Sequence, residues 1–177
     1  MVFESDQRSN APGAGVRRIR TIAYWIFTLI AAYEMIAGSM WDLLRIEYVQ
    51  DVLRHLGYPA YLLLILGVWK LPCGVVWLVP RFLRLKEWAY AGAIFNYTGA
   101  AASHILAGDG PKVWVAPAVF ALLTLASWAL RPSERRLQPA SPDLTTTRPV
   151  AWIVPIVIAV VMLVSALLTV PKGPAPI

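Results

Sequence analysis

The chain has few charged residues, one cysteine and little histidine. Only 15% of its 177 residues are charged, whereas 58% are hydrophobic, which is outside the usual balance of a soluble domain. Cys73 is the only cysteine, so no disulfide can form within the chain, and dithiol redox chemistry within one chain is excluded. Two histidines offer few metal ligands. A lipid bilayer is the environment that this composition predicts.

The sequence contains several long apolar stretches. Bilayer hydrocarbon about 30 Å thick needs roughly 20 helical residues per crossing. The stretches that satisfy this length cover residues 19–38, 59–79, 87–107, 113–130 and 150–170. We therefore predict an all-α integral membrane protein, in which a four-helix bundle over residues 19–130 is followed by one appended C-terminal transmembrane helix within 150–177.

Three segments are predicted to lie outside these spans. Residues 1–18 are polar and basic without apolar periodicity, which indicates a disordered cytoplasmic tail. Residues 131–149 contain four prolines, as expected of an exposed cytoplasmic linker. Residues 41–56 place apolar side chains three and four apart and predict an amphipathic helix, which Ser39 and Asp42 would start as a capping box. We expect this helix to cover the outer mouth of the bundle, and a solvated connector is the alternative.

The net charge of +6 comes from an uneven distribution of Lys and Arg. Eleven of them lie before or at the start of the first span, between the second and third spans, or between the fourth and fifth, whereas four lie in the remaining connections. The positive-inside rule then predicts a cytoplasmic N-terminus and an external C-terminus. Because this bias accounts for the basic composition, no nucleic-acid partner is predicted.

Three ionisable side chains interrupt the apolar spans and predict a buried polar cluster. Glu34, Lys70 and His104 lie within the first, second and third spans, and each costs at least about 2.5 kcal/mol to insert, so they should face the bundle interior. Small residues flank them on the same helical faces, as expected where helices touch. Asn96 shares the inward stripe of His104, and further hydrogen bonds are expected from Tyr33 and Tyr97.

The residues leave the role of this cluster open. In one interpretation Glu34 and Lys70 form an ion pair that fixes helix register, with His104 hydrogen-bonded nearby. In the other, the cluster lines a pocket that opens outward and binds a small molecule such as a quinone headgroup, because histidine and a buried carboxylate exchange the protons that quinone reduction requires. One inward histidine and one glutamate form a thin metal set. Haem fits less well, since His55 belongs to the amphipathic helix.

Three runs along the chain resemble a known family. They are ILGVWKLPC at residues 65–73, PRFLRLKEWAYAG at residues 80–92 and FNYTGAAASH at residues 95–104. Together they resemble the DoxX-like family of small bacterial membrane proteins over about residues 20–130. The resemblance implies a four-helix unit of the bacterial inner membrane, some of whose relatives are subunits or accessories of oxidoreductases linked to quinones and sulfur compounds.

Three functional hypotheses follow. The leading one is a non-catalytic protein or accessory subunit of a membrane redox system, whose polar pocket binds a quinone-like or other small ligand. A small proton-coupled transporter is a second, since intramembrane ionisable groups also mark proton pathways, although no inverted repeat is visible. A scaffold or chaperone for another membrane protein, docking through its last two spans, is a third.

Overall fold

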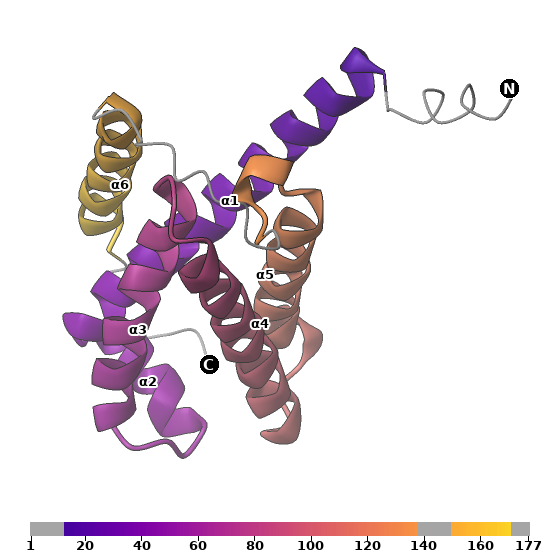
Figure 1. Ribbon diagram of the computed structural model, residues 1–177. Coiled ribbons are helices and arrows are strands. Elements are labelled where there is room, and N and C mark those ends of the chain that lie inside the picture. Colours follow the sequence, from indigo (N-terminus) through magenta and orange to yellow (C-terminus); the bar gives the residue numbers. More distant parts are fainter. Residues whose placement is uncertain (1–12, 138–149, 171–177) are drawn as a thin grey trace, which may run out of the picture.

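The computed structural model describes residues 13–137 and 150–170, and these residues form helices joined by short turns. The described residues contain six α-helices, and a short 3-10 helix, η1, follows the fifth. Figure 1 shows how the α-helices are arranged. Their bounds are α1 Ala14–Leu43, α2 Glu47–His55, α3 Tyr61–Leu78, α4 Leu83–Leu106, α5 Pro111–Leu130, η1 Ser133–Arg135 and α6 Val150–Leu168. The prediction of an all-α fold is confirmed.

Length and composition identify three of these helices as candidate membrane spans. They are α1, α3 and α5, and α6 is a shorter apolar helix at the C-terminal side. The 24 residues of α4 extend about 36 Å, which is long enough to cross a bilayer. Asn96, His104 and its glycine and hydroxyl-bearing residues lower its hydropathy, however. Five crossings therefore stay a prediction where α4 and α6 are concerned.

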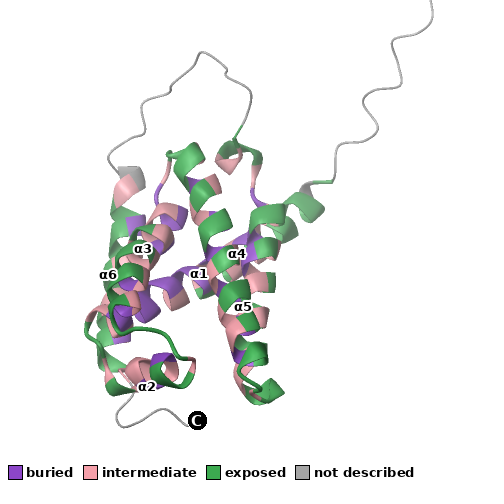
Figure 2. Cartoon of the chain, turned by 90° about the horizontal axis from the view of Figure 1, so that it is seen from below, coloured by how far each residue is buried: buried purple, intermediate pink, exposed green. Residues whose placement is uncertain are grey.

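Close packing of α1 against α3 forms the middle of the bundle. A Cβ atom added at Gly74 would lie 3.0 Å from the carbonyl oxygen of Ala32, and one at Gly67 would lie 3.1 Å from that of Ser39. The absence of side chains at these two positions lets the backbones approach closely. Figure 2 shows the buried residues concentrated between the helices and exposed residues on their outer faces. Those faces carry large apolar side chains such as Trp88 and Phe95, as suits contact with lipid.

The boundary between the first two helices differs from the prediction. α1 begins at Ala14, inside the predicted tail, and continues without a break through Ser39 to Leu43. Ser39 donates its hydroxyl to the carbonyl of Gly67 at 2.7 Å, so it does not cap a following helix, and the predicted capping box is wrong. The chain turns instead at Arg45, which has a φ of 49°, and the amphipathic helix is limited to α2.

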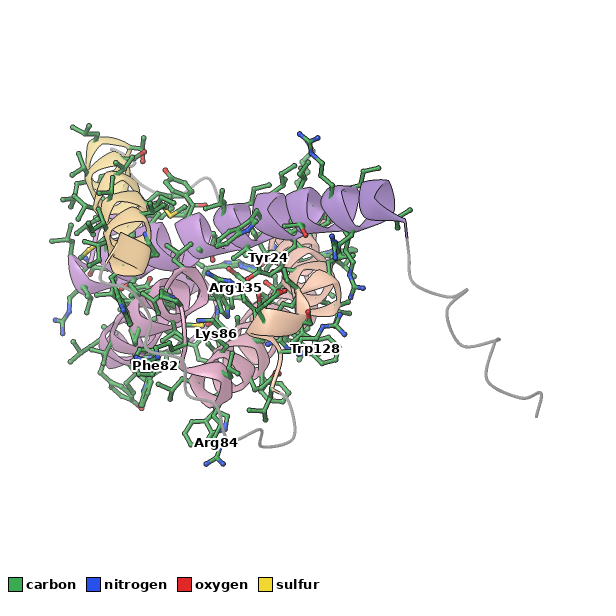
Figure 3. All side chains as sticks on the ribbon, turned by 45° about the horizontal axis from the view of Figure 1, so that its top comes forward. Tyr24, Phe82, Arg84, Lys86, Trp128 and Arg135 are labelled. Atoms are coloured by element: carbon green, nitrogen blue, oxygen red, sulfur yellow. The ribbon has the colours of Figure 1, made fainter. Side chains whose placement is uncertain are left out.

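The start of the predicted linker is part of the folded unit. Arg131 is buried and pairs with Glu87 at 2.7 Å. Arg135 donates to the carbonyl of Trp77 at 2.9 Å, and Lys86 donates to the carbonyl of Val76 at 2.6 Å. Figure 3 shows Lys86 and Arg135 lying between the helices, where they donate to carbonyls at the end of α3 that have no partner within the helix. Residues 131–137 are therefore not a simple exposed linker, and 138–149 lie outside the described residues.

The C-terminal helix packs on the outside of α1 and α3. Ala166 is fully buried in this contact, and the ring of Trp152 lies edge-on to Phe82 with centroids 5.9 Å apart. Near the other end of α6, the Tyr33 and Thr169 hydroxyls lie 3.3 Å apart. The helix is appended in sequence, but its described residues contact the bundle along its length.

Candidate ligand cavity

A cavity of about 460 Å³ lies beneath α2, between α3, α4 and α5. The inward face of α2 supplies an apolar roof that includes Val49, Val52 and Leu53. Polar groups line the rest of the cavity at different depths. They are Asp42, Tyr48, Tyr58, Lys70, Asn96, Ser103 and His104. The expected placement of the amphipathic helix over a mouth of the bundle agrees with this arrangement.

The deepest polar groups form one ion pair and one hydrogen-bonded pair beside it. Lys70 Nζ lies 2.9 Å from Asp42 Oδ2, and Glu34 accepts a hydrogen bond from the Tyr97 hydroxyl. Gly38 makes room for both pairs, since a Cβ atom there would lie 3.2 Å from Glu34 Oε1 and 3.4 Å from Lys70 Nζ. The positive charge of Lys70 therefore lies beside two carboxylates, and its direct partner is Asp42.

A hydrogen-bonded clip crosses the outer end of the cavity. Asp109, in the turn after α4, lies 2.7 Å from His104 Nδ1 through one oxygen and 2.7 Å from His55 Nε2 through the other. The hydrogen bonds from these two imidazoles hold the pKa of the Asp109 carboxyl below its usual range. A second link joins the hydroxyls of Tyr58 and Ser103 at 2.8 Å. Both contacts hold the C-terminal side of α2 against α4.

The six predicted site residues fall into three groups. Lys70, Asn96 and His104 line the cavity. Glu34 and Tyr97 pair with each other beside Lys70. Tyr33 lies against α6.

The predicted direct ion pair between Glu34 and Lys70 is replaced by the pair of Lys70 with Asp42. The hydrogen-bond partner of His104 is Asp109. The reason is position: Asp42 lies two turns beyond Glu34 on α1, which continues through Gly38 instead of ending there.

Three residues of the site were not predicted. Asp42 was assigned to a helix cap, His55 was assigned to the amphipathic helix, and Asp109 was not singled out. The signal that could have indicated Asp42 is Lys70 itself. A lysine buried opposite α1 favours a carboxylate partner on that helix, and Asp42 lies on α1 two turns beyond Glu34. The contact of His55 with Asp109 joins residues far apart in sequence, and no local pattern indicates it.

The cavity offers hydrogen-bonding groups around a lysine that already has a carboxylate partner. Within the described residues, the Asn96 side chain has no hydrogen-bond partner, although it lines the cavity. The same part of the chain contains no group of three or more histidine, cysteine or acidic side chains placed to hold a metal ion. A neutral molecule with hydrogen-bonding oxygens matches this chemistry better than an anion, because Lys70 is paired.

A comparison of the sequence with known protein families agrees with the fold and with these residues. Residues 12–127 match the DoxX-like family, a range that contains α1 to α4, most of α5 and every residue that lines the cavity. Searches of curated proteins and of solved structures found no match to the chain. With more than half of its length matched, this chain belongs to the DoxX-like family.

Proposed function

We propose that the cavity beneath α2 binds the headgroup of a quinone-like molecule, and that the chain serves a membrane redox system as an accessory or subunit. The observation that supports this most directly is the unpaired Asn96 amide beside the neutralised pair of Lys70 and Asp42. An amide can donate to a quinone oxygen without the cost of burying another charge. The imidazole of His104, whose Nδ1 is held by Asp109, supplies a second hydrogen-bonding group in the cavity wall.

We further propose that α4 and α6 cross the membrane with α1, α3 and α5, and that the N-terminus is cytoplasmic. The basic segments favour this arrangement because they gather at one end of the bundle. The start of α1, the turn between α3 and α4, and η1 lie together at that end, whereas α2 and the turn between α4 and α5 lie at the other (Figure 1). The cavity then opens on the external side of a bacterial inner membrane.

Binding of a short-chain quinone to the protein purified in mild detergent tests the proposal. Quinone is expected to quench tryptophan fluorescence and raise the melting temperature, since a ligand that binds the folded state stabilises it. The informative variant is Gly99→Phe, because Gly99 lines the cavity and an added Cβ there meets nothing within 4 Å. Its ring should fill the cavity without disturbing the helix.

Asn96→Leu removes the free amide and should weaken binding by roughly tenfold, the loss expected for one hydrogen bond. Tyr33→Phe is the matched control, because Tyr33 contacts α6 and does not line the cavity. Saturable binding that is equal in wild type, Gly99→Phe and Asn96→Leu would place the ligand elsewhere and refute the proposal. The transporter and scaffold hypotheses stay predictions, and liposome flux and partner capture test them.

A further inference from the structure

A second hollow runs between α3 and α4. It has a volume of about 360 Å³, and its walls include Trp69 and Cys73 from α3 and Trp88 and Gly92 from α4. The two tryptophans are 71% and 75% exposed, so they stand at the outer surface of the helix pair. Because this surface is otherwise apolar, the hollow opens toward the bilayer, and we call it the α3–α4 groove.

The groove and the cavity beneath α2 meet. Leu66, Lys70 and Asn96 line both of them. On α4 the lining continues from Trp88 to His104, a distance of about 24 Å at the rise of an α-helix. The two hollows therefore lie end to end along one seam.

The polarity of the lining changes along this seam. The groove is lined by aromatic and aliphatic side chains up to the point where Lys70 and Asn96 begin. The cavity then adds the Tyr58 and Ser103 hydroxyls and the His104 imidazole. A molecule that fits both hollows must be polar at one end and hydrocarbon at the other.

The groove offers a second way into the cavity, besides the outer mouth that the clip crosses. His55 and Tyr58 hold the α2 side of the cavity against Asp109 and Ser103. Across the groove, the Cys73 thiol of α3 donates to the Ala89 carbonyl of α4 at 3.1 Å, while the side chains of Trp69 and Trp88, both among the described residues, make no hydrogen bond across it. Balanced charge at Lys70 and Asp42 disfavours an anionic phosphate headgroup, because a buried anion needs its own counter-charge.

We propose that the natural ligand is a tailed, uncharged amphiphile of the isoprenoid quinone type, which enters sideways from the bilayer and keeps its tail in the α3–α4 groove. This inference rests on the proposed function, since it assigns the tail of the ligand whose headgroup the cavity binds. Leu66, Lys70 and Asn96 then surround the junction between headgroup and tail.

Photo-crosslinking in vesicles tests where the tail lies. The probe is a quinone that carries a diazirine in its tail, and adducts are located by mass spectrometry. Adducts are expected on groove residues such as Trp69 and Trp88. Gly92→Phe should reduce them by roughly tenfold while tail-less quinone still binds, because an added Cβ at Gly92 meets nothing within 4 Å and the ring has only the groove to fill. Gly99→Phe, on the same helix, should abolish both signals.

Each other outcome counts against a defined claim. Adducts spread over all lipid-facing helices and unchanged by Gly92→Phe would overturn the groove assignment while leaving headgroup binding intact. Failure of tail-less and tailed quinones to bind the wild-type protein would overturn the proposed function and this inference together. A phosphatidylglycerol with the same diazirine in its tail, if it labels the groove equally well in competition, would show that a bilayer lipid occupies it instead.

Discussion

Lys70 carries a positive charge into the interior of the bundle, and its neighbours determine the effect of removing it. Lys70→Met should leave Asp42 without its partner at 2.9 Å and lower the free energy of unfolding by about 3 kcal/mol. Adding Asp42→Asn should restore much of this loss, because the unpaired carboxylate is then gone. Unfolding in mixed micelles measures both changes.

A third variant, Glu34→Gln, tests whether Lys70 pairs directly with Asp42 or with Glu34. If Glu34→Gln rescues Lys70→Met better than Asp42→Asn does, the direct partner of Lys70 is Glu34, contrary to the structure. The double-mutant cycle is needed because both carboxylates act on the same lysine.

Asp109 gives the clip a dependence on pH. Its carboxyl pKa is lowered in the folded protein by hydrogen bonds from His104 and His55, so its contribution to stability is present above the unfolded pKa of about 3.9 and is lost as pH falls through the lower, folded value. The melting temperature of wild type minus that of Asp109→Asn should therefore be positive at pH 6 and shrink below about pH 4. A difference that stays constant down to pH 2 would mean that the clip contributes nothing through this charge.

Between elements, Gly67 and Gly74 determine how closely α1 and α3 approach. Gly74→Ala should cost about 1–3 kcal/mol, since its Cβ would meet the Ala32 carbonyl at 3.0 Å and the Ile36 side chain at 2.9 Å. Gly92→Ala is the matched control, because its Cβ meets nothing within 4 Å and alanine is the better helix former by about 1 kcal/mol. Thermal unfolding should move in opposite directions for the two variants. Equal shifts would show that the α1–α3 contact is looser than the structure has it.

The helices are predictable where hydropathy alone defines them, and less so where polar contacts set their ends. α3, α5 and α6 begin and end within a few residues of the predicted spans. α1 does not, because Gly38 and Ser39 resemble a helix end in sequence but are buried against α3, where Ser39 finds the Gly67 carbonyl. Here a tertiary contact overrides the local sequence signal for a helix end.

For the whole molecule, the two parts of the C-terminal region should contribute differently to stability. Truncation after residue 130 removes Arg131 and Arg135, which pair with Glu87 and the Trp77 carbonyl, and leaves those groups unsatisfied. Truncation after residue 149 removes α6, whose apolar contacts lipid can replace. We expect the first protein to melt at a clearly lower temperature than the second in the same detergent. Equal melting temperatures would indicate that residues 131–137 do not support the bundle.

The residues of the candidate site also divide into those that the sequence predicts and those that it does not. Lys70, Asn96 and His104 were predictable from sequence, because a polar side chain inside an apolar span must face inward, and all three line the cavity. Asp42 and Asp109 were not, because each lies near a helix end, where a carboxylate needs no special explanation. The cavity itself depends on α2 folding back over the bundle, and that arrangement is set by contacts between distant residues such as His55 and Asp109.

Native mass spectrometry of the protein released from mild detergent tests the central claim most directly. We predict that a fraction of the wild-type protein retains an uncharged, quinone-like molecule, and that Gly99→Phe, which fills the cavity, retains none. Tyr33→Phe should behave as wild type, because its side chain lies against α6. Retention of the same molecule by Gly99→Phe, or ligand-free wild-type protein that also fails to take up added quinone, would contradict the account.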